Sequence, residues 1–196
     1  LLAVTPVTTS LGAMATIIED KKYGMYRDFA ASPIKRSTIA GGYILSGFLV
    51  SLILTLLTFL LAEGYIVLYG GELLPIGAAL KVLALILFTT ASSSVMMFYL
   101  VSWFKSSNAF SAASTVIGTM VGFLTGIYIP IGNLPAGVQT VVKCFPVSHS
   151  GALFRQVLMA SPLEQTFAGA PASQVNSYKV AAGVVYRFGD QLMLTS

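Results

Sequence analysis

The run from Ile39 to Ala62 contains about 24 residues and no charged side chain. A helix rises about 1.5 Å per residue, so a run of that length can cross roughly 30 Å of hydrocarbon. Val82 to Phe104 and Ala109 to Ile129 are further uncharged runs, and Leu1 to Ile18 is a shorter one. Charged residues make up only 9% of the chain, against about 25% in an ordinary globular domain. We therefore predict an all-α membrane protein, a polytopic helical bundle with spans over residues 1–18, 39–62, 82–104 and 109–129.

A basic stretch from Glu19 to Gly42 separates the first two uncharged runs. The basic residues within it are Lys21, Lys22, Arg27, Lys35 and Arg36. Lysine and arginine resist translocation across a bilayer, so a short basic loop stays in the cytoplasm. We expect residues 19–38 on the cytoplasmic side. The net charge of +4 is then a signal of topology and not of nucleic-acid binding.

The other loops agree with that orientation. Glu63 and Glu72 make the second loop acidic, which predicts an external position, whereas Lys105 marks the third loop as internal. Everything after Pro130 is then external. Glu63 also lies at the edge of a predicted span, where an acid is either a proton carrier or, more commonly, a side chain solvated at the interface.

The basic stretch contains a helical pattern of its own. Tyr23, Tyr26 and Phe29 recur at helical spacing, which gives one apolar face and one charged face. Pro33 cannot continue a helix and pushes the residue before it toward an extended backbone. We predict a short amphipathic helix from Glu19 to Ser32. The pattern leaves two interpretations open, a helix that docks on a protein partner and an interfacial loop that contacts only lipid headgroups.

Three glycines four residues apart lie in the last uncharged run, namely Gly118, Gly122 and Gly126. At that spacing they share one helix face, where small residues let a second backbone approach closely. This face either packs against a neighbouring span of the same chain or forms an interface between two subunits.

Prolines divide the sequence beyond residue 129 into pieces too short to span a bilayer. Residues 134–159 fit two short external helices joined at Pro146, with Ser148 as the N-cap of the second. Residues 161–196 are more polar, and we expect them to form an external loop that leads toward a span outside this sequence.

The sequence lacks the residues of common catalytic and metal sites. It contains no GxxxxGK[ST] phosphate loop, so we expect it to bind no ATP in that way. Cys144 and His149 are its only cysteine and histidine, which excludes an internal disulfide and argues against a metal site or a Cys–His nucleophile. We therefore expect no catalytic residue, no metal and no enzymatic activity in this chain.

Two groups of motifs resemble a known family. Glu19, Gly24 and Pro33 precede a span that begins with a pair of glycines. The external segment contains GIYIPIGNLPxxVQ, followed by FPVS and by ALFR, which ends at Arg155. Over about residues 1–160 these motifs resemble the membrane subunit of ABC-2 type transporters, the bacterial exporters of drugs, lipids and polysaccharides. The G-T-x-E pattern of that family is broken here, because Met25 and Arg27 replace its threonine and its acid.

The resemblance implies six spans per subunit, of which the present runs are the second to the fifth, with the first and the last outside the sequence. It also implies that the helix from Glu19 to Ser32 is a coupling helix seated on a separate ATPase subunit, which binds ATP and Mg²⁺. The implied coupling residues are Glu19, Tyr23, Gly24, Tyr26, Phe29 and Pro33.

A dimer of membrane subunits in a bacterial plasma membrane is a further implication, most simply a homodimer. Its substrate would be a drug, as in multidrug resistance, a lipid or another amphipathic molecule moved outward. Two alternatives stay open at the level of sequence. One is a non-transporting assembly or resistance factor on the same scaffold, and the other is a proton-driven carrier, for which Glu63 is the candidate acid.

Overall fold

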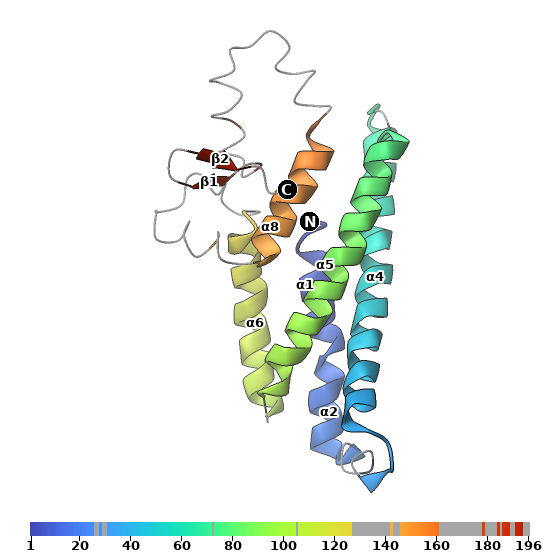
Figure 1. Ribbon diagram of the computed structural model, residues 1–196, viewed down its shortest axis with the longest axis vertical. Helices are drawn as coiled ribbons and strands as arrows, with labels where there is room; N and C mark the ends of the chain where they lie inside the picture. Colours follow the sequence, from blue (N-terminus) through green and yellow to red (C-terminus); the bar gives the residue numbers. More distant parts are fainter. Residues whose placement is uncertain are drawn as a thin grey trace. The chain divides into compact units, whose positions relative to one another are not determined.

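The computed structural model describes residues 1–25, 28, 31–71, 73–104, 106–126, 142, 146–160, 178, 184, 186–188 and 191–193. Helices make up its body (Figure 1), which confirms the predicted helical architecture. They are α1 (Thr5–Ala13), α2 (Ala15–Tyr23), α4 (Arg36–Leu68), α5 (Ile76–Ser102), α6 (Ser107–Leu124) and α8 (Pro146–Leu158). The strands β1 (Tyr186–Phe188) and β2 (Gln191–Met193) add a short antiparallel hairpin to the tail, which we expected to be a loop.

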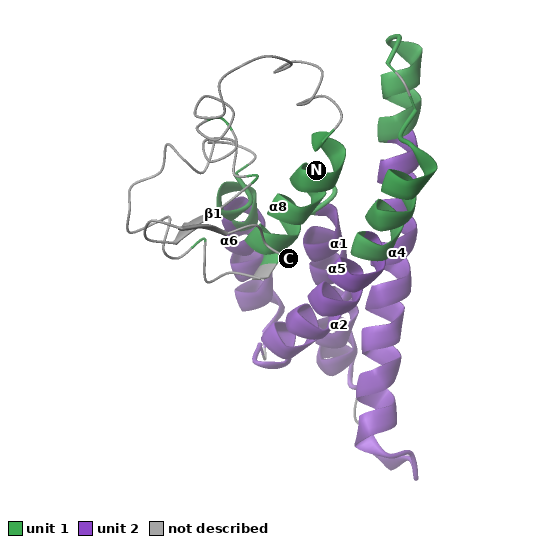
Figure 2. Cartoon of the chain, turned by 45° about the horizontal axis from the view of Figure 1, so that its top comes forward, with its two compact units in different colours: residues 1–4, 62–85, 121–196 green, residues 5–61, 86–120 purple. Residues whose placement is uncertain are grey.

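Within the described part of the chain, α4 and α5 are the helices long and apolar enough to cross a membrane. Helix α6 has 18 residues, and the continuation of its predicted span to Ile129 lies outside the described residues. The chain divides into two compact units, coloured separately in Figure 2. We call residues 5–61 and 86–120 the loop unit, because it carries the basic stretch, and residues 1–4, 62–85 and 121–196 the tail unit.

In the loop unit, the chain of α1 and α2 runs antiparallel to α4. Ser10 contacts Ser51, Met14 lies against Gly47, and Asp20 accepts a hydrogen bond from Tyr43. The contact residues on α4 are therefore spaced four apart, which places them on one face of the helix. The buried residues of α4 continue this face, namely Gly47, Ser51, Thr55 and Phe59. Small side chains at this spacing let the two helices approach closely.

Met14 separates α1 from α2 without turning the chain. Its dihedral angles remain in the right-handed helical region, with φ −73° and ψ −10°. The Ile17 amide donates to Met14 O at 3.1 Å, an i to i−3 bond that tightens one turn. The helical course therefore continues to Tyr23, beyond the predicted end of the first span at Ile18, because nothing in residues 19–23 breaks a helix.

Three buried serine hydroxyls join α1, α4 and α5. Ser10 Oγ lies 2.9 Å from Ser51 Oγ and 3.2 Å from Ser94 Oγ. All three side chains are fully buried. Ser51 also donates to Gly47 O at 3.0 Å, and Ser94 to Thr90 O at 2.8 Å. Lipid tails are as apolar as the surfaces of the helices, so no hydrophobic force drives helices together within a membrane. Hydrogen bonds between hydroxyl groups on neighbouring helices help to hold such a bundle together instead.

Helix α4 ends later than predicted. It continues past Ala62 to Leu68, so Glu63 lies inside the helix and not in a loop. The Gly71 amide donates to Ile66 O at 2.9 Å and the Gly70 amide to Val67 O at 3.1 Å, the pair of bonds of a Schellman motif. Gly70 has a φ of 83°, which glycine adopts without strain. Gly70 and Gly71 therefore end α4, whereas Glu63 does not interrupt it.

In the tail unit, Arg155 of α8 covers the C-terminus of α6. Its Nη2 donates to Thr125 O at 2.5 Å and to Gly126 O at 3.2 Å. These carbonyls lie where the last turn of a helix leaves acceptors unsatisfied and carries partial negative charge. Thr125 is buried beneath this contact. The guanidinium therefore neutralises a helix end that would otherwise be costly to bury.

The start of α8 corrects the predicted N-cap. The helix begins at Pro146, a residue well suited to the first helical position because that amide needs no partner. Ser148 lies inside the first turn, and its hydroxyl donates to Val142 O. Further along α8, Gln156 Nε2 donates to Val184 O at 2.7 Å, which ties the helix to the buried Val184 near the hairpin.

Candidate functional site

The predicted coupling residues gather at the end of α2 in the loop unit. Glu19 and Tyr23 lie on α2 with exposed side chains, and the Tyr23 ring is 69% exposed. Gly24 follows the helix directly. Pro33 is exposed in the bend before α4. Tyr26 and Phe29 lie outside the described residues, so the apolar face that they were predicted to share with Tyr23 is a prediction still.

The predicted single helix from Glu19 to Ser32 is broken at Gly24. That residue adopts a left-handed conformation with φ 83° and ψ −7°, which no residue with a Cβ adopts at low cost. The Lys22 ammonium lies 5.3 Å from the centroid of the Tyr23 ring, within the range of a cation–π contact. Glu19 and Tyr23 therefore lie in α2, before this break in the helix.

Two consecutive residues fasten this end of α2 to the neighbouring helices. The Tyr43 hydroxyl of α4 donates to Asp20 Oδ2 at 2.5 Å. Lys21 Nζ lies 3.5 Å from Ser102 O at the C-terminus of α5, where a helix dipole favours a cation. Our sequence analysis missed both pairs. No periodicity in the sequence links Tyr43 to an acid 23 positions away.

A hollow of about 400 Å³ lies beside the Asp20–Tyr43 pair. Residues of α2, of the bend and of the first turns of α4 line it. They are Thr16, Asp20, Ile34, Thr38, Ile39, Gly42, Tyr43 and Ser46. Asp20 is the charged residue of this lining, although the surrounding stretch is mainly basic.

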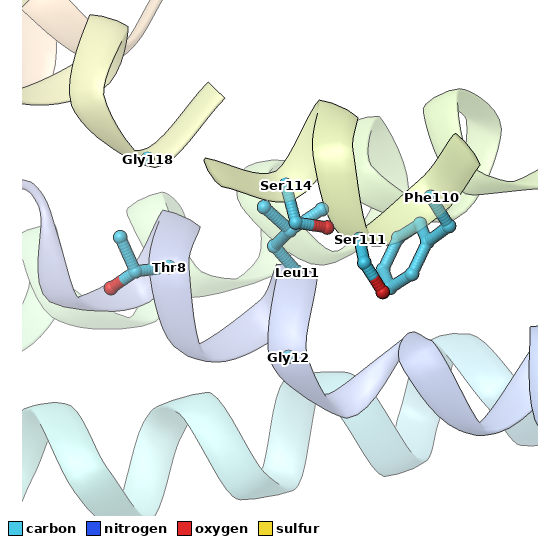
Figure 3. A pocket seen from close by; sticks show the side chains of 7 residues that line it. All are labelled: Thr8, Leu11, Gly12, Phe110, Ser111, Ser114 and Gly118. Atoms are coloured by element: carbon cyan, nitrogen blue, oxygen red, sulfur yellow. The ribbon is translucent and has the colours of Figure 1, made fainter. Parts of the chain in front are cut away.

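A second hollow, of about 390 Å³, lies between α1 and α6 in the loop unit (Figure 3). Its lining combines apolar and hydroxyl side chains, namely Thr8, Leu11, Gly12, Phe110, Ser111, Ser114 and Gly118. Within the described part of the chain, the buried Oγ of Ser114 has no hydrogen-bond partner. A buried hydroxyl left in that state costs about 1–3 kcal/mol. The hollow therefore offers apolar surface together with the hydroxyl of Ser111, while Ser114 Oγ itself lies beneath the accessible surface.

The three glycines of the predicted packing face differ in position. Gly118 and Gly122 lie in α6, Gly118 with open space around its missing Cβ and Gly122 buried. Gly126 lies beyond the end of α6 with a φ of 69°, so it ends the helix and does not extend the face. Gly126 is therefore removed from the predicted face, and a packing or dimer face of Gly118 and Gly122 stays a prediction.

In the described residues, no group of three His, Cys, Asp or Glu side chains could hold a metal ion. His149 lies partly buried on α8, and Cys144 lies outside the described residues. Glu63, the candidate proton carrier, is partly buried and accepts a hydrogen bond from the Leu74 amide at 3.3 Å.

Comparison with known families decides the class of the protein. The family model described as ABC-2 family transporter protein matches residues 2–185. The chain belongs to the ABC-2 transporter family. No curated protein and no solved structure matches it. The family resemblance found in the motifs is thereby confirmed, and the match extends past residue 160, where the resemblance was placed, almost to β1.

Membership makes the chain a membrane component of a transporter. The long apolar helices α4 and α5 are consistent with that role. The end of α2 and the hollow between α1 and α6 are two places where the described residues offer a contact surface. The first carries exposed aromatic and charged groups, and the second carries apolar and hydroxyl groups.

Proposed function

We propose that the chain is the membrane-spanning permease subunit of an ATP-driven exporter. A separate ATPase subunit binds and hydrolyses ATP, and the permease moves a drug, a lipid or another amphipathic substrate outward across a bacterial plasma membrane. The observation that carries this proposal is the match of the ABC-2 transporter family over residues 2–185. Residues 19–38 face the cytoplasm in this arrangement, in keeping with their positive charge.

The end of α2 supports contact with an ATPase. Tyr23 is 69% exposed, and Met25 and Ile34 of the same basic stretch are 44% and 49% exposed. Apolar side chains grouped at the charged end of a helix bundle are more typical of a protein interface than of a solvated loop. Buried aromatic residues commonly dominate the energy of such interfaces. Tyr23 is therefore the described residue best placed to act as an anchor on the ATPase.

The hollow between α1 and α6 supports an amphipathic substrate. Leu11 and Phe110 offer apolar surface, while Ser111 offers a hydroxyl (Figure 3). Binding sites for small molecules are mostly apolar, with a few polar groups that fix orientation. Among the described residues, no side chain with a formal charge lines this hollow, so neutral or weakly polar groups fit it best.

Co-purification with the ATPase tests the proposal. The full-length permease is expressed with a tag, and recovery of an ABC ATPase and its ATP hydrolysis are measured for wild type, Tyr23→Ala, Tyr26→Ala and Phe29→Ala. Tyr69→Ala is the matched control, because Tyr69 is a 76% exposed tyrosine at the opposite end of α4.

We expect Tyr23→Ala to lower ATPase recovery about tenfold or more, since truncating an interface anchor often costs about 2 kcal/mol. Tyr69→Ala leaves recovery unchanged. A permease that recovers no ATPase in any form would instead support the non-transporting alternative. Equal recovery in all four variants would favour the interpretation of the loop as a lipid-contacting segment.

A further inference from the structure

The contacts between the first helical segment and α4 change character toward the basic stretch. Ser10 and Ser51 meet through buried hydroxyls, and Met14 packs on Gly47. The last contact, between Asp20 and Tyr43, pairs a carboxylate with a phenol at 2.5 Å. Hydrogen bonds to a charged acceptor are shorter and about twice as strong as bonds between neutral groups. A charge-assisted hydrogen bond thus joins this helix pair at the end nearest the loop.

The position of Asp20 relative to Gly24 gives this bond a mechanical role. Gly24, with its left-handed backbone, is the point where the chain leaves α2. Asp20 lies one helical turn before it, so any displacement of the loop reaches Asp20 through one rigid turn of helix. The next residue, Lys21, points to Ser102 O at the end of α5. The last turn of α2 is therefore held to α4 on one side and to α5 on another.

The surroundings allow this bond to break and re-form. Asp20 and Tyr43 both line the hollow of about 400 Å³, and both side chains are partly buried. Water or a reoriented tyrosine ring can occupy that space, so opening the bond requires no rearrangement of a packed core.

We propose that the Asp20–Tyr43 hydrogen bond is a latch that makes the end of α2 move together with α4. Asp20 and Tyr43 are then positioning residues, which transmit displacement of the coupling loop into α4 and contact neither the substrate nor the ATPase. The proposal rests on the proposed function for the source of that displacement. The latch itself is a property of the permease alone and is tested without a partner.

Pulsed EPR on the full-length permease measures the latch directly. Spin labels are placed at Lys22→Cys on α2 and Leu57→Cys on α4, with Cys144→Ser to remove the native thiol. Both label sites are exposed. Leu57 lies 14 residues beyond Tyr43, about 21 Å along the helix, which brings the label pair into the measurable range. The variants are Tyr43→Phe and Asp20→Asn, and Tyr65→Phe is the control on the same helix.

Tyr43→Phe removes one hydroxyl and keeps the ring, so folding should be preserved. We expect the population of separated conformers to rise about tenfold, since a bond to a charged group that is only partly buried contributes at the low end of its range. Asp20→Asn keeps an acceptor and should give an intermediate width. Tyr65→Phe should match wild type. A Tyr43→Phe distance distribution as narrow as that of wild type would overturn the latch.

The ATPase complex gives a second, independent readout. The same label pair is compared without nucleotide and after trapping with ATP and orthovanadate. If α2 and α4 move together, the distance in the wild type is the same in both states, whereas it changes in Tyr43→Phe. A wild-type distance that changes on trapping would overturn the proposal. Loss of the complex altogether would instead contradict the proposed function, and the measurement on the permease alone would still decide the latch.

Discussion

The side chain of Met14 occupies the space in which a Cβ of residue 47 would stand, so Gly47 sets how closely α4 approaches the first helical segment. The methyl end of Met14 is the group in contact. Methionine is flexible, and its far end can move at little cost. The contact therefore distinguishes a small side chain at position 47, which Met14 can accommodate, from a large one, which it cannot.

Gly47→Leu should lower the stability of the permease by about 1–3 kcal/mol, the usual cost of overpacking a well-packed contact. Gly47→Ala should change it little, because only the Met14 methyl must shift and alanine favours the helix. Thermal unfolding in detergent, followed by size-exclusion chromatography, measures both. Gly41→Leu is the matched control, since an added Cβ at Gly41 meets nothing within 4 Å. Rescue of Gly47→Leu by Met14→Ala would identify the clash, and equal stability of both leucine variants would refute it.

Ser10→Ala should destabilise the loop unit by about 0.6 kcal/mol, a typical value for a hydrogen bond between membrane helices. Ser10→Leu should cost more than 1 kcal/mol, because the site is fully buried between helices that meet through small side chains. Chemical or thermal unfolding provides the comparison. Thr115→Ala serves as control, since its exposed hydroxyl bonds only within α6. An unchanged midpoint for Ser10→Leu would show that this cluster is not packed as described.

Arg155→Met should loosen the C-terminal turn of α6 in the tail unit. The guanidinium donates to Thr125 O and Gly126 O, and bonds from a charged donor contribute about 1.5–3 kcal/mol. Hydrogen exchange of the peptide over residues 121–126 should therefore accelerate about tenfold or more. Arg155→Lys keeps the positive charge but not the planar guanidinium that fixes the direction of these bonds, so it should restore only part of the protection. Lys81→Met, an exposed change in the same unit, should leave exchange of this peptide unaltered.

Substitutions of Gly122 and Gly118 in α6 should distinguish an effect on folding from an effect on subunit assembly. Gly122 is buried, so Gly122→Leu should impair folding of the monomer. Gly118 has open space at its Cβ position, where it lines the hollow between α1 and α6, so Gly118→Leu should fold normally and should weaken association only if the two permease subunits meet at this face. Multi-angle light scattering of the purified variants reports the mass of the assembly. A Gly118→Leu protein that keeps the wild-type mass would place the subunit interface elsewhere.

The proposed topology predicts which cysteines react from each side. After replacement of Cys144, cysteines at Ser37 and Ser106 should react with a membrane-impermeant maleimide only in opened cells. A cysteine at Ser173, which lies outside the described residues, should react in intact cells. The expectation follows from the basic residues around the first and third loops. Labelling of Ser37 in intact cells would reverse the orientation and remove the ATPase contact from the end of α2.

The course of the helices was largely predictable, because uncharged length is read directly along the chain. The ends were not, since they depend on single backbone and side-chain contacts. Glu63 stays inside α4 because that helix continues to its glycine cap, and the carboxylate finds the Leu74 amide across the turn. Lys81 likewise lies within α5, where its side chain is exposed. A charge near the end of an apolar run therefore marks the membrane surface better than it marks the end of a helix.

Some residues of the candidate site were predicted from the sequence, but the hydrogen bonds that join them to other helices were not. Aromatic spacing drew attention to Tyr23, and its exposure keeps it a candidate anchor. The spacing also suggested one helix from Glu19 to Ser32, where the left-handed backbone of Gly24 intervenes. Glycine at a helix end and glycine within a helix look alike in one sequence. Pairs such as Asp20 with Tyr43 arise only when two antiparallel helices fix their register, which a single sequence does not encode locally.

Ser10, Ser51 and Ser94 at the centre of the loop unit have three hydroxyl protons but take part in four hydrogen-bond contacts. If Ser51 and Ser94 keep their backbone acceptors, the one hydroxyl proton of Ser10 serves Ser51 or Ser94, but not both at once. The two arrangements differ by a single rotation of the hydroxyl about the Cβ–Oγ bond. A small shift of α1 toward α4 or toward α5 can therefore be followed by that rotation, and α1 stays hydrogen-bonded to a neighbour throughout.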